Sequence, residues 1–288
     1  ANAAAAAAAV APRGFGGLDD PFGGDSAFAP PQPSFEPARP TVDLGVCFNA
    51  LMYKDRGVLY EDQYLQVGIQ MAFAGGCGSA TLYLGNKHAS APLTGTSVTA
   101  VPSASVLAEM AAAAPAVVAP GQQTQVPLRL TAIGPVTDVP VARLQYAIGN
   151  VAVYQDLRLP VACHRFLVPN PAIAKDMFFE QWRVLGSPPY KAQQMVQRET
   201  ALTTDHVVAV MRAAGLGTQH GYLDPSPYNE AGAAYYEMGL AGARTRTLVM
   251  CRVEGNPQNM AHFRVTVVSA HPALSAAIKD TVVARLRA

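Results

Sequence analysis

The sequence has few of the features that mark catalytic or metal-binding proteins. Its four cysteines are scattered, and none has the CxxC or CxxH spacing of a zinc site or belongs to a disulfide framework. There is no Gly-rich phosphate loop and no GxSxG elbow, and the six histidines lack metal-ligand spacing. We therefore expect no catalytic residue, no metal and no cofactor, and a reducing, cytoplasmic compartment.

The charges are nearly balanced. With 21 Lys and Arg against 20 Asp and Glu, the net charge is +1, so nucleic acid is not expected as a partner. No run of about eighteen strongly apolar residues is present, and no membrane-spanning helix is expected. The basic excess lies in residues 166–288, where twelve basic side chains face nine acidic ones, net +3.

Residues 1–40 predict a disordered hinge or linker. Ala, Pro and Gly dominate this stretch, and such a composition buries too little apolar surface to offset the entropy of ordering the chain. It nevertheless contains isolated phenylalanines beside acids, the pattern of short linear motifs. Asp20-Pro21-Phe22 is one such candidate; the alternative is a linker with incidental phenylalanines.

Residues 41–165 predict an antiparallel, immunoglobulin-like β-sandwich. Apolar and polar residues alternate with the period of a half-buried strand, and Gly149-Asn150 indicates a hairpin. We interpret the Ala-rich segment 104–120 as an inserted loop. The expected strands are 65–73, 81–84, 97–101, 126–132, 141–148 and 151–161.

Residues 166–288 predict an α+β platform, an antiparallel sheet with helices packed on it. Residues 203–205 can cap one helix, a short helix is expected at 190–198, and an apolar stripe predicts a closing helix over 272–286. The expected strands are 233–238, 245–254 and 262–269.

The stretch from Asp176 to Gly186 contains the only tryptophan. Phe178, Trp182 and Leu185 recur at i, i+4 and i+7, which predicts one face of a helix. Asp176 can cap this helix and Gly186 can end it. Its aromatics either pack entirely into a core or leave part of the cluster open as a docking pocket. The basic excess in this half of the chain favours the pocket.

Five segments in the same order show a family resemblance: residues 57–68, 83–87, 178–182, 224–227 and 251–254. Together they resemble the C-terminal appendage, or ear, of alpha-adaptin, the large alpha subunit of the endocytic clathrin adaptor complex. The resemblance runs from about Gly57 to the C-terminus, whereas residues 1–40 and the Ala-rich segment lie outside it.

The resemblance implies a protein-interaction domain and not an enzyme. The platform of that family binds Asp-Pro-Phe/Trp and Phe-x-Asp-x-Phe peptides of endocytic accessory proteins. An aromatic slot fits the ligand phenylalanine, and arginine binds the ligand aspartate through charge-assisted hydrogen bonds. A further basic position of the family is Val268 here, so one charge contact is lost. Phe178 points elsewhere on the helix and is assigned to the core, and the implied binding residues are Phe179, Trp182, Arg252, Glu254 and Arg264.

The resemblance also implies a second peptide groove on the sandwich, for Trp-x-x-Phe motifs. Gln70 stands where the family has Lys, which removes a charge partner for acidic flanks, and Tyr83 stands where it has Phe and can still stack on a ligand Trp. The alternative is that these are ordinary exposed strand residues. The implied residues are Gly68, Gln70, Tyr83 and Gln123.

The implied function is recruitment of endocytic accessory proteins at clathrin-coated pits of the plasma membrane, with other adaptor subunits contacted through a trunk that this sequence lacks. The alternatives are an appendage of beta-adaptin or of a Golgi coat subunit or, from another class, an α+β hydrolase. One hypothesis goes beyond the family: Asp20-Pro21-Phe22 occupies the platform pocket, in trans more readily than in cis because the linker is short.

Overall fold

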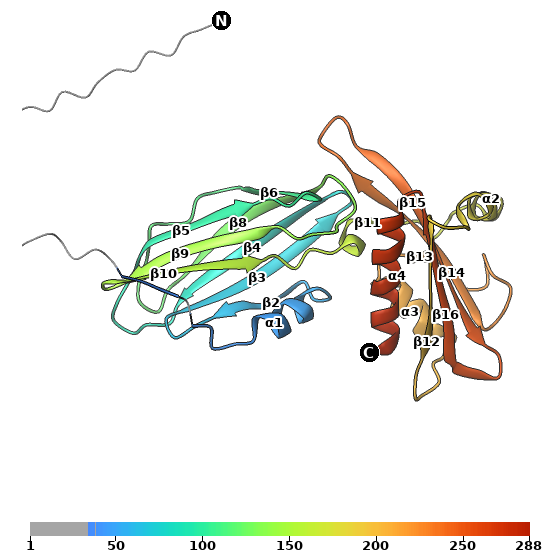
Figure 1. The fold of residues 1–288 in the computed structure, drawn as a ribbon, viewed down its shortest axis with the longest axis horizontal. Coiled ribbons are helices and arrows are strands. Elements are labelled where there is room, and N and C mark those ends of the chain that lie inside the picture. The colour runs from blue at the N-terminus through green and yellow to red at the C-terminus, as the bar shows by residue number, and fades with distance from the viewer. Residues whose placement is uncertain (1–33, 38) are drawn as a thin grey trace, which may run out of the picture. The chain divides into compact units, whose positions relative to one another are not determined.

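The computed structural model describes residues 34–37 and 39–288. The Asp20-Pro21-Phe22 motif and most of the predicted linker lie outside the described residues. The limits predicted for the linker and the two domains, residues 1–40, 41–165 and 166–288, stay a prediction. Three sheets, almost entirely antiparallel, make up the described fold (Figure 1).

Two of these sheets form the predicted sandwich. The first has the strand order β2 (Arg56–Glu61), β3 (Leu65–Ala74), β4 (Cys77–Asn86), β8 (Gln123–Ala132) and β6 (Val106–Met110). The second has the order β1 (Ser34–Pro37), β10 (Val151–Arg158), β9 (Val141–Ile148), β5 (Leu93–Val101) and β7 (Val117–Val118). The pairs in both sheets are antiparallel, apart from β1 with β10, which is parallel.

A buried carboxylate links the two sheets of the sandwich. Asp62 accepts hydrogen bonds from the hydroxyl of Tyr60, at 2.5 Å, and from that of Tyr146 on β9. Its other oxygen accepts from the backbone N–H groups of Tyr64 and Leu65, each at 2.7 Å. Burial, and then the hydrogen bond and charge of Asp62, raise the pKa of both bonded tyrosines well above the ordinary value.

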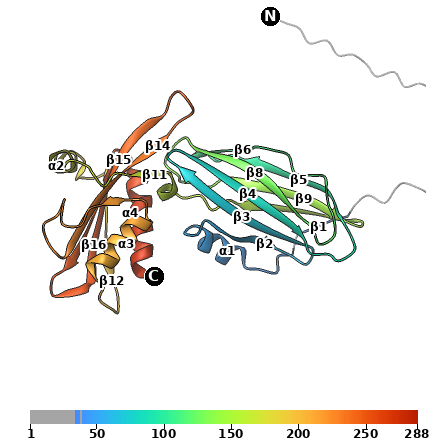
Figure 2. The same ribbon diagram turned by 180° about the vertical axis from the view of Figure 1, so that it is seen from behind.

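The third sheet belongs to the platform. Its order is β11 (Leu167–Pro169), β14 (Asn229–Met238), β15 (Thr245–Asn256), β16 (Asn259–Ser269) and β12 (Lys191–Gln197), and β13 (Gly217–Thr218) pairs with β14. The predicted closing helix is α4 (Pro272–Arg287), and its apolar stripe packs fully buried against the sheet together with α3 (Thr204–Ala213). Figures 1 and 2 show α2 (Lys175–Leu185) on the opposite face of the sheet from α4.

Four local expectations were wrong or incomplete. Residues 190–198 form strand β12 instead of a helix, because pairing with β16 overrides the helix propensity of its Ala, Gln and Met residues. The Ala-rich segment 104–120 is not simply a loop, since β6 pairs with β8 and β7 with β5. Helix α2 begins after Ala174, which places Asp176 inside its first turn. Helix α1 (Leu44–Leu51), capped by Asp43, was not expected.

Candidate functional site

Helix α2 divides its aromatic side chains between a core and a surface. Phe178 is fully buried, whereas Phe179 has 39% of its surface exposed. The ring of Trp182 stacks on that of Phe178, with centroids 5.5 Å apart and planes 20° from parallel. The assignment of Phe178 to the core is confirmed, and the half-buried Trp182 presents a partly open aromatic surface beside Phe179.

The cluster beneath α2 fixes this aromatic surface to the sheet. Val268 on β16 is fully buried there, on the same sheet face as Arg264. Val268, at the position expected to be basic from the family resemblance, therefore makes a buried apolar contact in this chain. The cluster consists of Ile173, Phe178, Leu223, Ala231, Ala233, Met250 and Val268, with Trp182, Leu185 and Leu248 packed against it.

The other end of the same sheet face holds the predicted charged residues. The register of β15 and β16 places Glu254 directly opposite Arg264. Glu254 accepts two hydrogen bonds from Arg264, at 2.6 and 2.7 Å, and lies 3.0 Å from a terminal nitrogen of Arg252. Arg252 also donates through Nε to the buried carboxylate of Asp224, at 2.7 Å. The hydrogen bonds and charge of Glu254 raise the pKa of Arg264.

The aromatic and the charged residues thus lie at two ends of one face. Arg264 is four strand residues from Val268, a separation of roughly 13 Å at the rise of a β-strand. A groove of about 760 Å³ continues from Glu254 and Arg264 past Met195 and His262. The groove is lined by Glu254 and Arg264 but by no residue of α2, so the predicted platform residues lie on one sheet face as an aromatic end and a charged end.

Exposed apolar side chains gather around this surface. On α2, on or just before β12, and in the loop before β14, a group of large hydrophobic residues is more than a third exposed, with 67% for Val184 and 63% for Met195. Apolar side chains grouped in this way, with a polar border, mark interaction sites. The group comprises Met177, Phe179, Val184, Tyr190, Met195, Tyr222 and Tyr228.

The four residues predicted on the sandwich also share one surface. Gly68 on β3 lies opposite Tyr83 on β4, and the hydroxyl of Tyr83 donates to the side-chain oxygen of Gln70, at 3.1 Å. Gln123 on β8 follows the same alternation and faces outward with them. Gly68 leaves the surface beside the Tyr83 ring open, because it has no side chain.

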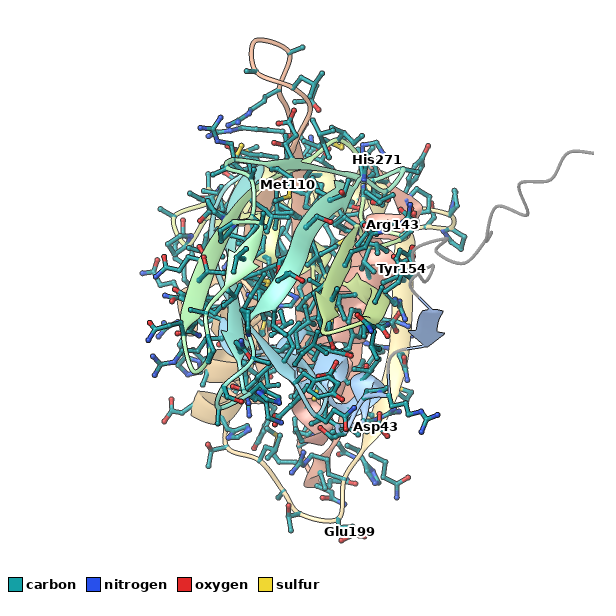
Figure 3. All side chains as sticks on the ribbon, turned by 90° about the vertical axis from the view of Figure 1, so that its left-hand side faces the viewer. Asp43, Met110, Arg143, Tyr154, Glu199 and His271 are labelled. Carbon is teal, nitrogen blue, oxygen red and sulfur yellow. The ribbon has the colours of Figure 1, made fainter. Side chains whose placement is uncertain are left out.

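One residue on this outer face was missed from the sequence. Arg56 on the edge strand β2 lies directly opposite Gln70 and is exposed, with no ion pair in the described part of the chain. On the outer face of the other sheet the cation is already paired: Figure 3 shows Arg143 beside Tyr154, and Arg143 binds Asp156 at 3.1 Å. Only the strand register reveals that Arg56 supplies a positive charge next to Gln70.

The described residues offer little for chemistry. Across residues 39–288, no group of three or more His, Cys, Asp or Glu side chains could hold a metal ion. Burial raises the pKa of the Cys163 thiol to about 12 and also raises that of Cys251, so neither is a ready nucleophile. No helix in the described part of the chain is long and apolar enough to cross a membrane.

A β-sandwich followed by an α+β platform, with the predicted binding residues on outward faces of both, is the layout of a protein-interaction module. Comparison with known proteins specifies the module further. Residues 55–158 match the family described as adaptin C-terminal domain, and residues 165–286 match alpha adaptin AP2, C-terminal domain. The chain belongs to the alpha-adaptin family and corresponds to the C-terminal appendage of its members.

Curated relatives agree with this assignment. The chain is 31% identical over 269 residues to AP-2 complex subunit alpha-2 of Arabidopsis thaliana, covering 93% of this chain and 26% of the relative. It is 28% identical to AP-2 complex subunit alpha-2 of Dictyostelium discoideum, covering 83% and 24%. The chain therefore spans about a quarter of the length of these relatives. A solved structure, the GAE domain of yeast GGA1, has a TM-score of 0.32 at 10% identity, covering 36% of this chain and 97% of that domain.

Proposed function

We propose that this appendage recruits endocytic accessory proteins by binding short linear motifs on its platform. The observation that supports this most strongly is the aromatic pair of exposed Phe179 and half-buried Trp182, which lies above a sealed core on the sheet face that also carries a charged groove. The aromatic end suits the phenylalanine or tryptophan of an Asp-Pro-Phe/Trp or Phe-x-Asp-x-Phe motif. The polar end suits the remainder of the peptide.

The outer face of the sandwich is proposed as a second site, for Trp-x-x-Phe motifs. Tyr83 offers a ring for stacking, and Gly68 leaves room beside it. Each site is shallow, so each motif binds weakly, and a disordered partner with several motifs gains strength from multivalency. This arrangement suits a hub that assembles and releases partners.

For the whole protein we propose a place at clathrin-coated pits of the plasma membrane, in complex with other adaptor subunits. This proposal rests on the AP-2 alpha relatives, of which this chain represents about a quarter. The Asp20-Pro21-Phe22 motif stays a predicted ligand for the platform of a neighbouring molecule. Peptide affinities measured with and without residues 1–40 test it, and equal affinities would rule it out.

The test of the platform is titration of a fluorescent Asp-Pro-Phe peptide against wild type and Phe179→Ala. Since Phe179 is exposed, its loss removes contact with the ligand without opening the core, and affinity is expected to fall about ten-fold. Val46→Ala is the matched control, because Val46 is 64% exposed on helix α1 and lies outside the platform. Trp182→Ala is expected to abolish binding.

Equal affinities for wild type, Phe179→Ala and Trp182→Ala would show that the peptide does not bind at α2. Circular dichroism of each variant verifies that the fold is retained. A hydrolase screen addresses the other class of function, since turnover abolished by a polar substitution near Trp182 would contradict a purely binding role.

A further inference from the structure

The two platform arginines are already neutralised within the protein. Arg252 pairs with Asp224 and Glu254, and Arg264 pairs with Glu254 through two hydrogen bonds. Two positive and two negative charges therefore cancel at this end of the face. A ligand carboxylate that approaches either arginine meets the like charges of Asp224 and Glu254, which lowers the attraction it experiences.

Among the described strand residues of this sheet face, Lys191 is a cation with no ion pair. It is the first residue of β12 and lies directly opposite Val268 of β16. Side chains of such cross-strand partners point to the same side, with Cβ atoms roughly 5 Å apart. The alternation along β12 agrees, since Val196 faces the α4 core and Gln194 bonds Lys279 of α4, whereas Lys191 belongs to the other set.

This position places Lys191 beside the aromatic end of the surface. Val268 belongs to the cluster that contains Phe178, and Trp182 packs against that cluster. The stem of Lys191 therefore flanks the aromatic residues, and its ammonium group makes no hydrogen bond or ion pair within residues 39–288. The residue is half-buried, so its charge is only partly screened by solvent.

We propose that Lys191 binds the carboxylate of the acidic residue that adjoins the ligand's aromatic side chain, and that it selects acidic over neutral motifs at the platform. This rests on the proposed peptide-binding function. A flexible ammonium with three donors reaches a carboxylate in several orientations. The acidic residue of the ligand is thus recognised at the aromatic end of the surface, whereas a carboxylate at the arginine end has to displace Glu254.

The test compares two labelled peptides that differ only in Asp-Pro-Phe against Asn-Pro-Phe, by fluorescence anisotropy. Lys191→Met keeps most of the stem and removes the charge, so it is expected to weaken the Asp peptide about three- to ten-fold and leave the Asn peptide unchanged. Lys191→Arg should retain the preference for Asp. Lys54→Met, an exposed lysine of the sandwich, is the matched control and should change neither affinity.

Three results would overturn the proposal. An equal loss for both peptides with Lys191→Met would indicate a packing role for the stem. Unchanged binding of the Asp peptide by Lys191→Met, while Phe179→Ala weakens it, would refute the role of Lys191 and leave the platform function standing. Failure of the wild-type protein to bind either peptide would refute the platform function and this inference together.

Discussion

Replacement of Asp62 by Asn is expected to destabilise the sandwich strongly. The Asp62 side chain is 3% exposed and accepts four hydrogen bonds, two from tyrosine hydroxyls and two from backbone N–H groups. An asparagine keeps one oxygen for the backbone but turns an NH₂ group toward the two hydroxyls. The variant therefore loses two hydrogen bonds to a charged acceptor, each contributing about 1.5–3 kcal/mol. Hydrogen bonds from the new NH₂ group to the rotated tyrosine hydroxyls replace only part of this energy. The free energy of unfolding should fall by about 3 kcal/mol.

Urea denaturation followed by far-UV circular dichroism measures this loss. Asp43→Asn is the matched control: Asp43 is exposed, caps α1 by accepting from Gly45 and Val46 at 2.8 and 3.0 Å, and asparagine caps a helix equally well. Its stability should be unchanged. A loss below about 1 kcal/mol for Asp62→Asn, the contribution of one ordinary hydrogen bond, would refute the argument that this carboxylate links the two sheets.

On α2, Phe178→Ala is expected to lower the free energy of unfolding by about 3–5 kcal/mol, because it opens a cavity in a sealed cluster. Phe179→Ala should lower it by less than about 0.5 kcal/mol, because Phe179 is exposed. Similar losses for the two variants in urea titrations would contradict the assignment of Phe178 to the core and Phe179 to the surface. The two tyrosines bonded to Asp62 have raised pKa values in the folded state, so their contribution to stability is complete below about pH 10. As the pH rises further this contribution is lost, at up to about 2.7 kcal/mol per pH unit for the two groups together. Urea titrations between pH 8 and 11 measure this loss, and a flat profile would argue against it. On the sandwich, Arg56→Glu should weaken an acidic Trp-x-x-Phe peptide about three- to ten-fold, Arg183→Glu on α2 should not, and equal affinities would exclude Arg56 from the site.

Residue periodicity predicted the parts of the fold in which burial and sequence pattern coincide. Strand β3 alternates between buried and more exposed residues over most of its length, and the stripe on α4 has the spacing of a helix, so both were predicted correctly. Strand β12 was mistaken for a helix because its residues favour a helix in isolation, and only pairing with β16 makes them extended. Strand β6 was missed because the Ala-rich composition around it hides the alternation of Val106 and Ala108.

The candidate sites were likewise predictable only where a residue's role follows from local spacing or from the family resemblance. The i, i+4 spacing and the family resemblance together placed Phe178 in the core and Phe179 outside it. The resemblance also pointed to Arg252 and Arg264, but not to the fact that Glu254 binds both. Arg56 and Lys191 could not be predicted, because each becomes a neighbour of the site only through the register of two strands that are distant along the chain.

In the proposed binding function, the position of Glu254 between two arginines determines how affinity responds to salt. An anionic ligand that reaches this end of the platform displaces Glu254 from an arginine and does not add a new ion pair. Because the number of ion pairs stays constant, few counterions are released, and affinity at this end varies little with ionic strength. Dissociation of the ligand is equally easy, because the carboxylate of Glu254 stays tethered next to the arginines and pairs with them again. The platform can therefore exchange one acidic partner for another without passing through a state in which its arginines are bare.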